Sequence, residues 1–387
     1  MKRRSYSKKA RALSLFLSCM LILGVLCLPA KSTEASFSPQ SLSARSAILI
    51  DADDGIVLAE KNARERMGEA STTKIMTALV IAENMPLDQK VSIPKDAVGT
   101  EGSSVYLCEG ELLTVKDLLY ALLLASANDA AAALAILCSG SIEAFADKMN
   151  GRAEELGLRD THFTNPHGLY DEDHYTTAYD LAQISAEALK NGHLRAIFAT
   201  KRATIPLGAT ETDPDGEGAR YLINHNKLLS LYDGAIGVKT GFTKKTGRCL
   251  VSAAERDGMT LIAVTLDAPD DWRDHTAMLD YGFFSYERTT LFDVGEYSYT
   301  YAVSGGVESY VSAVNSTPIT LTLPKQRESE TVCVELPQRF EIAPVEMGAI
   351  LGQMTVSVNG RSASSPLVAA YSVEATTKKK HKFFWQD

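Results

Sequence analysis

Strand-forming runs stand at both ends of the segment from about residue 37 to residue 287, and helical patterns fill its middle. Near the start, Ala47–Ile50 and Ile56–Leu58 flank the turn Asp53-Asp54-Gly55, which is typical of a β-hairpin. Near the end, three more strands are predicted, at Ile236–Lys239, Cys249–Ala254 and Leu261–Leu266. This order predicts an α+β domain in which one antiparallel sheet is assembled from both ends of the segment, with a helical lobe beside it.

The helical patterns carry their own start and stop signals. Thr114 and Asp117 have capping-box spacing, and Gly140 follows the last apolar position of another pattern. Helices are predicted at about Thr72–Ala82, Thr114–Ala125, Asp129–Cys138, Thr177–Leu189 and Asp274–Tyr281.

After about residue 290 the pattern changes to short runs rich in Val, Tyr and Thr, separated by turns such as Gly305-Gly306 and Asn359-Gly360. Strands are predicted at Tyr297–Val303, Ser309–Val314, Ile319–Leu323, Val332–Leu336 and Met354–Val358. We expect a small all-β domain at 290–375 with a spacer or packing role. The last residues, 376–387, are basic and then aromatic, which suits contact with a membrane surface or a solvated terminus.

The first 35 residues predict a secretory signal peptide. A basic start precedes an apolar run from about Leu13 to Leu28, and the small-x-small sequence Thr33-Glu34-Ala35 follows. The run is short for a membrane-spanning helix, although an uncleaved anchor is the alternative. Cleavage would remove seven Lys/Arg and one Glu and change the formal net charge from −9 to −15, which disfavours nucleic-acid binding.

Four cysteines remain after the signal peptide: Cys108, Cys138, Cys249 and Cys333. None has C-x-x-C or metal-ligand spacing, so no metal site is expected. We expect buried free thiols, with disulfides in an exported protein as the alternative.

Three short motifs follow one another in an order that suggests a catalytic centre. Ser71-Thr72-Thr73-Lys74 begins a predicted helix, Ser126-Ala127-Asn128 lies between two helices, and Lys239-Thr240-Gly241 lies on a strand. Alone, each motif is better explained as a helix cap, a loop or a strand end. Their joint occurrence in these contexts is a far stronger signal.

The spacing of Ser71 and Lys74 is compatible with a nucleophile and its base. Residues i and i+3 share a helix face, so the serine oxygen and the lysine nitrogen can come within hydrogen-bond distance. A serine needs a base to become nucleophilic, and a lysine can serve only if its pKa is lowered. Burial and a second cation, for which Lys239 is the candidate, both lower that pKa.

The other motif residues have roles that suit the same reaction. Ser126 can relay a proton to a leaving amine, and Asn128 can hold a substrate carbonyl or orient Lys74. Lys239 and Thr240 can bind a carboxylate. The backbone N–H groups of Ser71 and Phe242 are candidates for an oxyanion hole, and Gly241 permits close approach of a substrate.

The S-x-x-K, S-x-N and K-T-G motifs resemble those of the penicillin-recognising serine enzymes. Within that group, the chain is similar to low-molecular-mass penicillin-binding proteins of the D-alanyl-D-alanine carboxypeptidase type. The resemblance covers 37–287, extends to 290–375, and includes Asn165-Pro166-His167-Gly168-Leu169 and Leu279-Asp280-Tyr281-Gly282-Phe283. It implies a β-lactamase/transpeptidase-like catalytic domain at 36–287.

The resemblance also implies roles and surroundings. Ser71 would be the acyl-enzyme serine, Lys74 the proton acceptor, Ser126 the relay and Lys239 the substrate-binding lysine. The substrate would be the D-Ala-D-Ala end of a peptidoglycan stem peptide, β-lactams would inhibit, and no cofactor would be needed. The protein would act outside the cytoplasm, in the cell wall or at the outer face of the membrane.

Two positions depart from the family pattern or invite another role. Family members often hold the substrate carboxylate with an arginine before the last catalytic-domain helix. Arg273 is the nearest candidate, but few residues separate it from Gly282-Phe283, and the alternative is a solvated residue at the start of the helix. His167 is interpreted as an ordering loop residue rather than a base, because Lys74 fills that role.

Two alternative functions are compatible with parts of this pattern. A class A β-lactamase would share the motifs, but it needs an E-x-x-L-N segment where this chain has Thr161-His162-Phe163-Thr164-Asn165. A catalytically inactive wall-interaction protein is disfavoured by the intact motif set.

Overall fold

The computed structural model describes residues 37–210, 216–327, 332–336 and 339–376. The predicted signal peptide and nearly all of the basic-aromatic tail lie outside these residues.

A five-stranded antiparallel sheet unites the two ends of the first segment, as predicted. Its order is β2-β1-β9-β8-β7, so the first strand of the segment pairs with its last. The strands are β1 Ser46–Asp51, β2 Val57–Lys61, β7 Ala235–Thr243, β8 Gly247–Arg256 and β9 Met259–Leu266. All residues of β1 and β9 are buried, which means that both faces of the sheet are covered there. Strand β7 is left at one edge.

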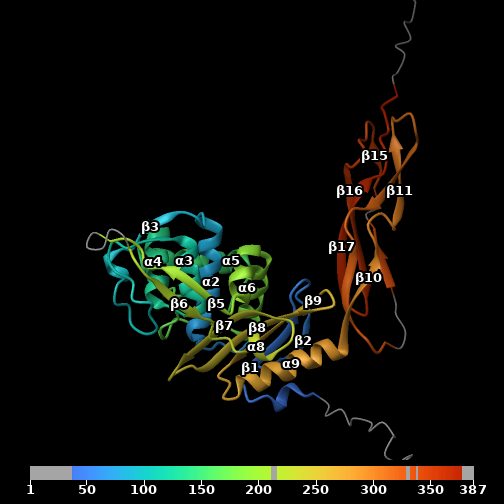
Figure 1. Ribbon diagram of the computed structural model, residues 1–387. Helices are drawn as coiled ribbons and strands as arrows, with labels where there is room; N and C mark the ends of the chain where they lie inside the picture. The colour runs from blue at the N-terminus through green and yellow to red at the C-terminus, as the bar shows by residue number, and fades with distance from the viewer. Residues whose placement is uncertain (1–36, 211–215, 328–331, 337–338, 377–387) are drawn as a thin grey trace, which may run out of the picture. The chain divides into compact units, whose positions relative to one another are not determined.

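The predicted helices are present, and the capping residues explain several of their ends. Thr114 and Asp117 form the capping box, and Gly140 ends its helix at φ +87°. The helices are α2 Lys74–Asn84, α3 Val115–Leu124, α4 Asn128–Ser139, α5 Ile142–Glu155, α6 Ala178–Lys190, α7 Gly192–Ala199, α8 Leu228–Leu231 and α9 Asp271–Ser285. Helix α6 packs on β1 and β9, and α9 packs on β8 and β9 (Figure 1).

The sequence patterns did not predict every element. Helix α5, which has 14 residues, and the shorter helices α7 and α8 were not predicted, and α9 begins three residues earlier than expected. Three 3₁₀ turns and two small two-stranded sheets were also not predicted: η1 Pro39–Ser41, η2 Ala70–Thr73, η3 Lys95–Ala97, β3 Lys90–Ser92 with β4 Leu112–Thr114, and β5 Arg202–Pro206 with β6 Ala219–Ile223.

The C-terminal region is all β with an apolar core of its own, so the predicted α+β class followed by an all-β region is confirmed. The core includes Tyr301, Val311, Met354, Val356 and Leu367, all nearly inaccessible to solvent. The strands are β10 Tyr286–Phe292, β11 Ser298–Ser304, β12 Tyr310–Asn315, β13 Ile319–Pro324, β14 Val332–Glu335, β15 Glu341–Ile342, β16 Ile350–Val358 and β17 Arg361–Ala369. Strands β10, β15 and β17 were not predicted.

The cysteines are free thiols in the structure, but only one of the four is buried. Cys249 is enclosed in β8, Cys138 is half-buried, and Cys108 and Cys333 are exposed. The prediction of buried thiols is therefore wrong for Cys108, which lies in a surface loop, and for Cys333, which lies in β14 at the edge of its sheet.

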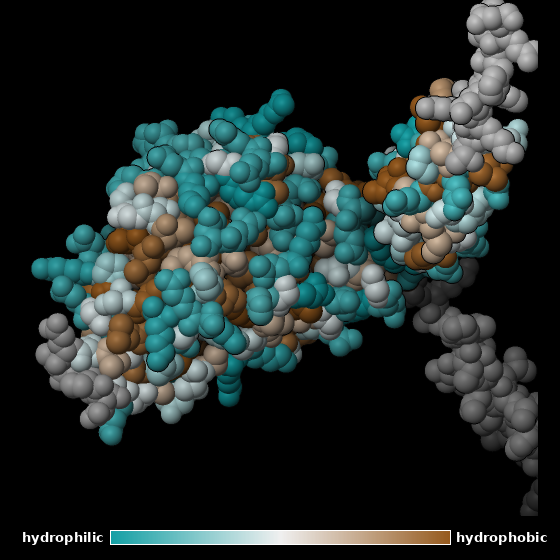
Figure 2. Space-filling view, turned by 90° about the horizontal axis from the view of Figure 1, so that it is seen from above, coloured by the Kyte–Doolittle hydropathy of each residue, from teal (hydrophilic) through white to brown (hydrophobic). Residues whose placement is uncertain are grey.

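The visible surface of the described residues is mostly hydrophilic, with apolar side chains gathered in patches (Figure 2). Within the described part of the chain, no single helix has the length and apolarity to cross a membrane. The pair α4 and α5, which bends by 82°, passes the same criterion on length and composition.

Candidate active site

Ser71 lies on a tight turn that leads directly into α2. Ala70 has a left-handed backbone (φ +49°) and is the first residue of the 3₁₀ turn Ala70–Thr73. The backbone N–H and the hydroxyl of Thr72 both donate to the carbonyl oxygen of Glu69, which closes the turn. The sequence predicted the helix start here, and the structure adds the sharp turn that leaves Ser71 half-buried at the mouth of a cleft.

The side chain of Lys74 is fully buried and has three oxygen neighbours. Its Nζ lies 2.9 Å from Oγ of Ser71, 2.7 Å from Oδ1 of Asn128 and 2.7 Å from the carbonyl oxygen of His167. The amide and carbonyl oxygens can only accept hydrogen bonds. A neutral amine would therefore use its two N–H groups on them and direct its lone pair at Ser71, whose hydroxyl would then donate to Nζ.

Burial favours the neutral form of this amine. Desolvation is the main reason that the pKa of Lys74 is well below its ordinary value, and the nearby charge of Lys239 lowers it further. The carboxylate of Asp129 opposes the shift. Burial also lowers the pKa of Lys239 to about 7, and its Nζ donates to the carbonyl oxygen of Thr240 at 2.8 Å.

The S-x-N motif leads into α4 close to the amine of Lys74. Ser126 has a left-handed backbone (φ +59°), and Asn128 is the first residue of the helix. Nδ2 of Asn128 donates to the carbonyl oxygen of Glu101, which fixes the amide with Oδ1 toward Lys74. Ser126 lines the same cleft as Ser71, and among the described residues its hydroxyl makes no hydrogen bond to Ser71 or Lys74.

Strand β7 forms the opposite wall and approaches the serine turn closely. A Cβ added to Gly241 would lie 3.0 Å from the backbone nitrogen of Ser71 and 2.9 Å from the carbonyl oxygen of Glu69. Any side chain at 241 would thus push the strand away from the nucleophile. Thr240, Gly241 and Phe242 line the cleft, whereas Lys239 is almost fully buried behind it.

The cleft has a volume of about 630 Å³ and includes residues that the sequence did not single out. They come from the loop between β3 and β4, from the end of β6 and the segment after it, from β8 and from the start of α9: Ser103, Ile223, Asn224, His225, Lys227, Arg248, Asp271 and Trp272. Strand register was the available signal for Arg248, because it pairs directly with Phe242 across the β7–β8 hairpin.

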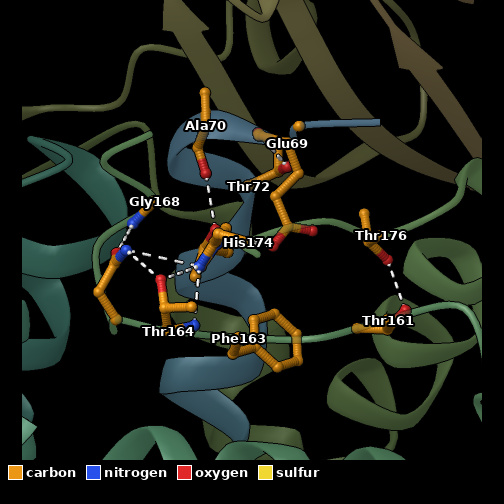
Figure 3. A network of polar contacts seen from close by, with 12 residues as sticks. Glu69, Ala70, Thr72, Thr161, Phe163, Thr164, Gly168, His174 and Thr176 are labelled. Carbon is orange, nitrogen blue, oxygen red and sulfur yellow. Dashed lines mark hydrogen bonds and ion pairs between the residues drawn. The ribbon is translucent and has the colours of Figure 1, made fainter. Parts of the chain in front are cut away.

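A buried polar network supports the serine turn from below (Figure 3). Nε2 of His174 lies 3.0 Å from Oε1 of Glu69 and 2.8 Å from Oγ1 of Thr73. The backbone N–H of Thr164 donates to Nδ1 of His174 at 3.1 Å, so Nε2 carries the proton in the neutral ring. The network ties the turn before Ser71 to the loop whose His167 carbonyl contacts Lys74. Neither Glu69 nor His174 stood out in the sequence.

The structure defines the surroundings of His167 and Arg273. The ring of His167 is buried, which lowers its pKa to about 3, and its Nδ1 accepts from the N–H of Leu169 at 3.3 Å. Its backbone carbonyl, which no sequence motif indicates, contacts Nζ of Lys74. Arg273 lies on α9 with a side chain that is 84% exposed, 3.9 Å from Asp270, and it does not line the cleft.

The described residues contain no group of three or more His, Cys, Asp or Glu side chains arranged to hold a metal ion.

Comparison with known proteins gives two family matches that together span most of the chain. Residues 32–270 match the family of D-alanyl-D-alanine carboxypeptidases, and residues 286–375 match the C-terminal domain of penicillin-binding protein 5. The D-alanyl-D-alanine carboxypeptidase DacF of Bacillus subtilis is 34% identical over 365 residues, covering 90% of this chain and 92% of that protein.

Another relative and a solved structure are similar to this chain as well. A D-alanyl-D-alanine carboxypeptidase of Streptomyces sp. (strain K15) is 40% identical over 244 residues, covering 59% of this chain and 83% of that protein. The crystal structure of penicillin-binding protein 5 from Haemophilus influenzae superposes with a TM-score of 0.72 at 27% identity, covering 87% of this chain and 99% of that one.

Proposed function

Because the chain belongs to the D-alanyl-D-alanine carboxypeptidase family of serine peptidases, we propose that it removes the terminal D-Ala from peptidoglycan stem pentapeptides through an acyl-enzyme on Ser71. The family binds penicillin, so β-lactams are expected to acylate the same serine.

The acylation step follows from the surroundings of Lys74. Neutral Lys74 accepts the proton of the Ser71 hydroxyl as Oγ attacks the carbonyl carbon of the penultimate D-Ala. The developing oxyanion is bound by the backbone N–H groups of Ser71 and Phe242. Ser126 passes the proton on to the amine of the last D-Ala, the peptide bond breaks, and D-Ala leaves.

The second half of the reaction restores the enzyme. Neutral Lys74 takes a proton from a water molecule, which attacks the ester carbonyl. The Oγ of Ser71 then leaves and regains its proton, releasing the shortened peptide. Asn128 keeps the amine oriented through both steps, while Lys239 and Thr240 bind the polar groups of the substrate.

One observation carries this proposal: the Nζ of Lys74 has two obligate acceptors and a serine hydroxyl as its neighbours. A lysine held only for packing would not need two acceptors that leave its lone pair aimed at the nucleophile.

The class A β-lactamase alternative needs a carboxylate to activate the deacylating water. At the comparable position, the Thr161 hydroxyl donates to Oδ2 of Asp180 at 2.8 Å and so serves the start of α6. The expected result with nitrocefin is therefore slow turnover after a burst, and rapid steady hydrolysis would favour the β-lactamase reading instead.

The remaining parts of the chain have proposed roles as well. Residues 1–35 would direct export and be removed, 36–287 would form the catalytic domain, and 290–375 would act as a β-domain spacer. The tail, 376–387, would contact the membrane peripherally. The enzyme would then work in the wall or at the outer face of the membrane and contribute to cell-wall biogenesis and cell shape.

The direct test is release of D-Ala from a stem pentapeptide by the purified protein, measured with a D-amino-acid oxidase assay. We expect release by the wild type and none by Ser71→Ala. No release by a folded wild-type protein would support the inactive wall-interaction alternative.

A further inference from the structure

The loop at 101–107, which contacts Asn128, is itself held by an arginine that does not line the cleft. We propose that Arg220 is a positioning residue for acylation: it holds this loop against Asn128, which in turn holds the amine of Lys74 beside Ser71. The inference rests on the proposed function, which supplies the acylation step that the position of the loop can affect.

The loop contacts Asn128 through two backbone carbonyl groups. The backbone N–H of Asn128 donates to the carbonyl oxygen of Ser103 at 2.6 Å, and its Nδ2 donates to the carbonyl oxygen of Glu101. A Cβ added to Gly102 would lie 2.6 Å from Nδ2 of Asn128, so the loop backbone lies directly against the amide. The other end of the amide, Oδ1, lies 2.7 Å from Nζ of Lys74. A displacement of the loop would therefore move the amide and, with it, the amine.

The buried carboxylate of Asp129 holds one side of this loop at the start of α4. Its Oδ2 accepts from the hydroxyl of Ser104 at 2.6 Å and from the N–H of Leu107 at 3.0 Å. Its Oδ1 accepts from the N–H of Val105 at 3.3 Å. A carboxylate satisfies only the donors of the loop, so the carbonyl groups of Val105 and Tyr106 need a donor from elsewhere.

Arg220, on β6, is that donor. Its Nε donates to the carbonyl oxygen of Val105 at 2.7 Å, and its Nη2 donates to that of Tyr106 at 3.1 Å. The remaining N–H groups donate to the carboxylate of Glu111 and to the carbonyl oxygen of Pro206. A guanidinium has five N–H groups, and here each of them has an acceptor.

The burial of this ion pair favours a role in geometry over a role in stability. The side chains of Arg220 and Glu111 are only 11% and 2% exposed. An ion pair buried this deeply adds little net stability because both charges lose their water, but its two parallel hydrogen bonds fix the direction of the guanidinium. Strand β6 continues to Ile223, which lines the cleft as Ser103 does, so the arginine joins two parts of the cleft wall.

The test compares Arg220→Met with Arg152→Met, because methionine removes every donor and keeps an unbranched side chain. Arg152 is the matched control: its side chain is 20% exposed, it pairs with Glu83 and Glu187, and it does not line the cleft. The rate constant for acylation by benzylpenicillin should fall roughly 10- to 100-fold in Arg220→Met, as expected for a small displacement of a catalytic group. It should stay within about twofold of wild type in Arg152→Met.

A double-mutant cycle with Asn128→Ala separates positioning from a general loss of structure. Because Arg220 acts through the amide of Asn128, its removal should slow acylation by at most about threefold once that amide is gone. A defect that only loosens the fold would slow wild type and Asn128→Ala by the same factor. Equal factors in the two backgrounds would overturn the proposal.

Removing Arg220 alone leaves a buried carboxylate unpaired, so Arg220→Met/Glu111→Gln is the matched form without either charge. It should fold, and it should acylate as slowly as Arg220→Met because the loop carbonyls still lack their donor. Acylation at the wild-type rate by either folded variant contradicts the proposal, as does failure of both to fold, which would make the ion pair structural. Failure of the proposed function is distinguishable, because wild type would then form no acyl-enzyme with benzylpenicillin.

Discussion

Nζ of Lys74 lies 2.9 Å from Oγ of Ser71, and the fully buried amine has two further oxygen neighbours that only accept hydrogen bonds. Of its three hydrogen-bond partners within the described residues, only the serine hydroxyl can give this nitrogen a proton. This burial and this position are what the proposed role of Lys74 as the base for Ser71 requires.

Replacing Lys74 with Met keeps much of its volume and removes the base. We expect the rate of acylation by benzylpenicillin to fall roughly 10²- to 10⁴-fold, the usual contribution of a positioned general base. Stopped-flow or gel-based measurement of acyl-enzyme formation gives the rate, and circular dichroism checks the fold. Acylation within tenfold of wild type would mean that another group takes the proton.

The pH dependence of acylation should reflect the two buried lysines. Lys74 acts when neutral, so the rate should fall as pH falls through its lowered pKa. Burial lowers the pKa of Lys239 to about 7, so a step that needs its charge should weaken as pH rises through about 7. The expected profile of kcat/KM for D-Ala release is bell-shaped.

The variant Lys239→Gln tests the coupling between these lysines. Without the neighbouring positive charge, the pKa of Lys74 should rise, so the acid limb of the profile should move to higher pH. An acid limb in the same place in both proteins would show that the two amines do not interact.

The pair Glu69 and His174 should stabilise the turn that presents Ser71. Glu69→Leu leaves Nε2 of His174 and the hydroxyl of Thr73 without this acceptor in a buried site, and we expect a loss of about 1–3 kcal/mol in the free energy of unfolding. Urea unfolding measures this loss.

A control variant and a double variant complete the test. Glu65→Leu, which removes an exposed ion pair with Arg45, should cost no more than about 1 kcal/mol. The double variant Glu69→Leu/His174→Leu should lose less than the sum of its single variants, and strict additivity would argue against a coupled pair.

Gly168 is expected to be intolerant of substitution because of what surrounds it. An added Cβ would lie 1.9 Å from the carbonyl oxygen of Ala70, a backbone atom that cannot move without shifting the serine turn. Gly99 is the matched control, since it has a similar left-handed φ but open space around the Cβ position. Gly99→Ala should cost about 1–2 kcal/mol from backbone strain alone.

The cost of Gly168→Ala should clearly exceed that of its control and should slow acylation as well. Thermal unfolding and penicillin acylation of the two variants give the comparison. Equal effects at 168 and 99 would show that close contact with the Ala70 carbonyl is unimportant.

Local patterns predicted most of the long elements of the catalytic region, with helix α5 as the exception. The period of apolar residues and the Thr114 and Thr177 caps identified α3 and α6, and the turn at Asp53-Asp54-Gly55 identified the first hairpin. Helix α5 was missed because its sequence is polar on much of its surface, and only a few residues such as Phe145 and Met149 are buried. The strands of the two-stranded sheets β3–β4 and β5–β6 have too few residues for a period to show, and no short turn marks the connection between them.

The sequence motifs identified the candidate site residues. The other residues of the site come together only through tertiary contacts, which the sequence does not show. The carbonyl of His167 contacts Lys74 from 93 positions away, and nothing in a sequence marks a backbone oxygen. Glu69 and His174 are polar residues in polar stretches, so their burial emerges only when the loop folds over the turn. At the start of α9, Asp271 lines the cleft and Arg273 does not, and the apolar pattern had placed the start of this helix only at Asp274.

Mass spectrometry of the protein after brief treatment with benzylpenicillin shows whether Ser71 is the residue that becomes acylated. We expect a single covalent adduct, located by proteolysis on the peptide that contains Ser71 and absent from Ser71→Ala. An adduct on another peptide, or one that persists in Ser71→Ala, would contradict this expectation.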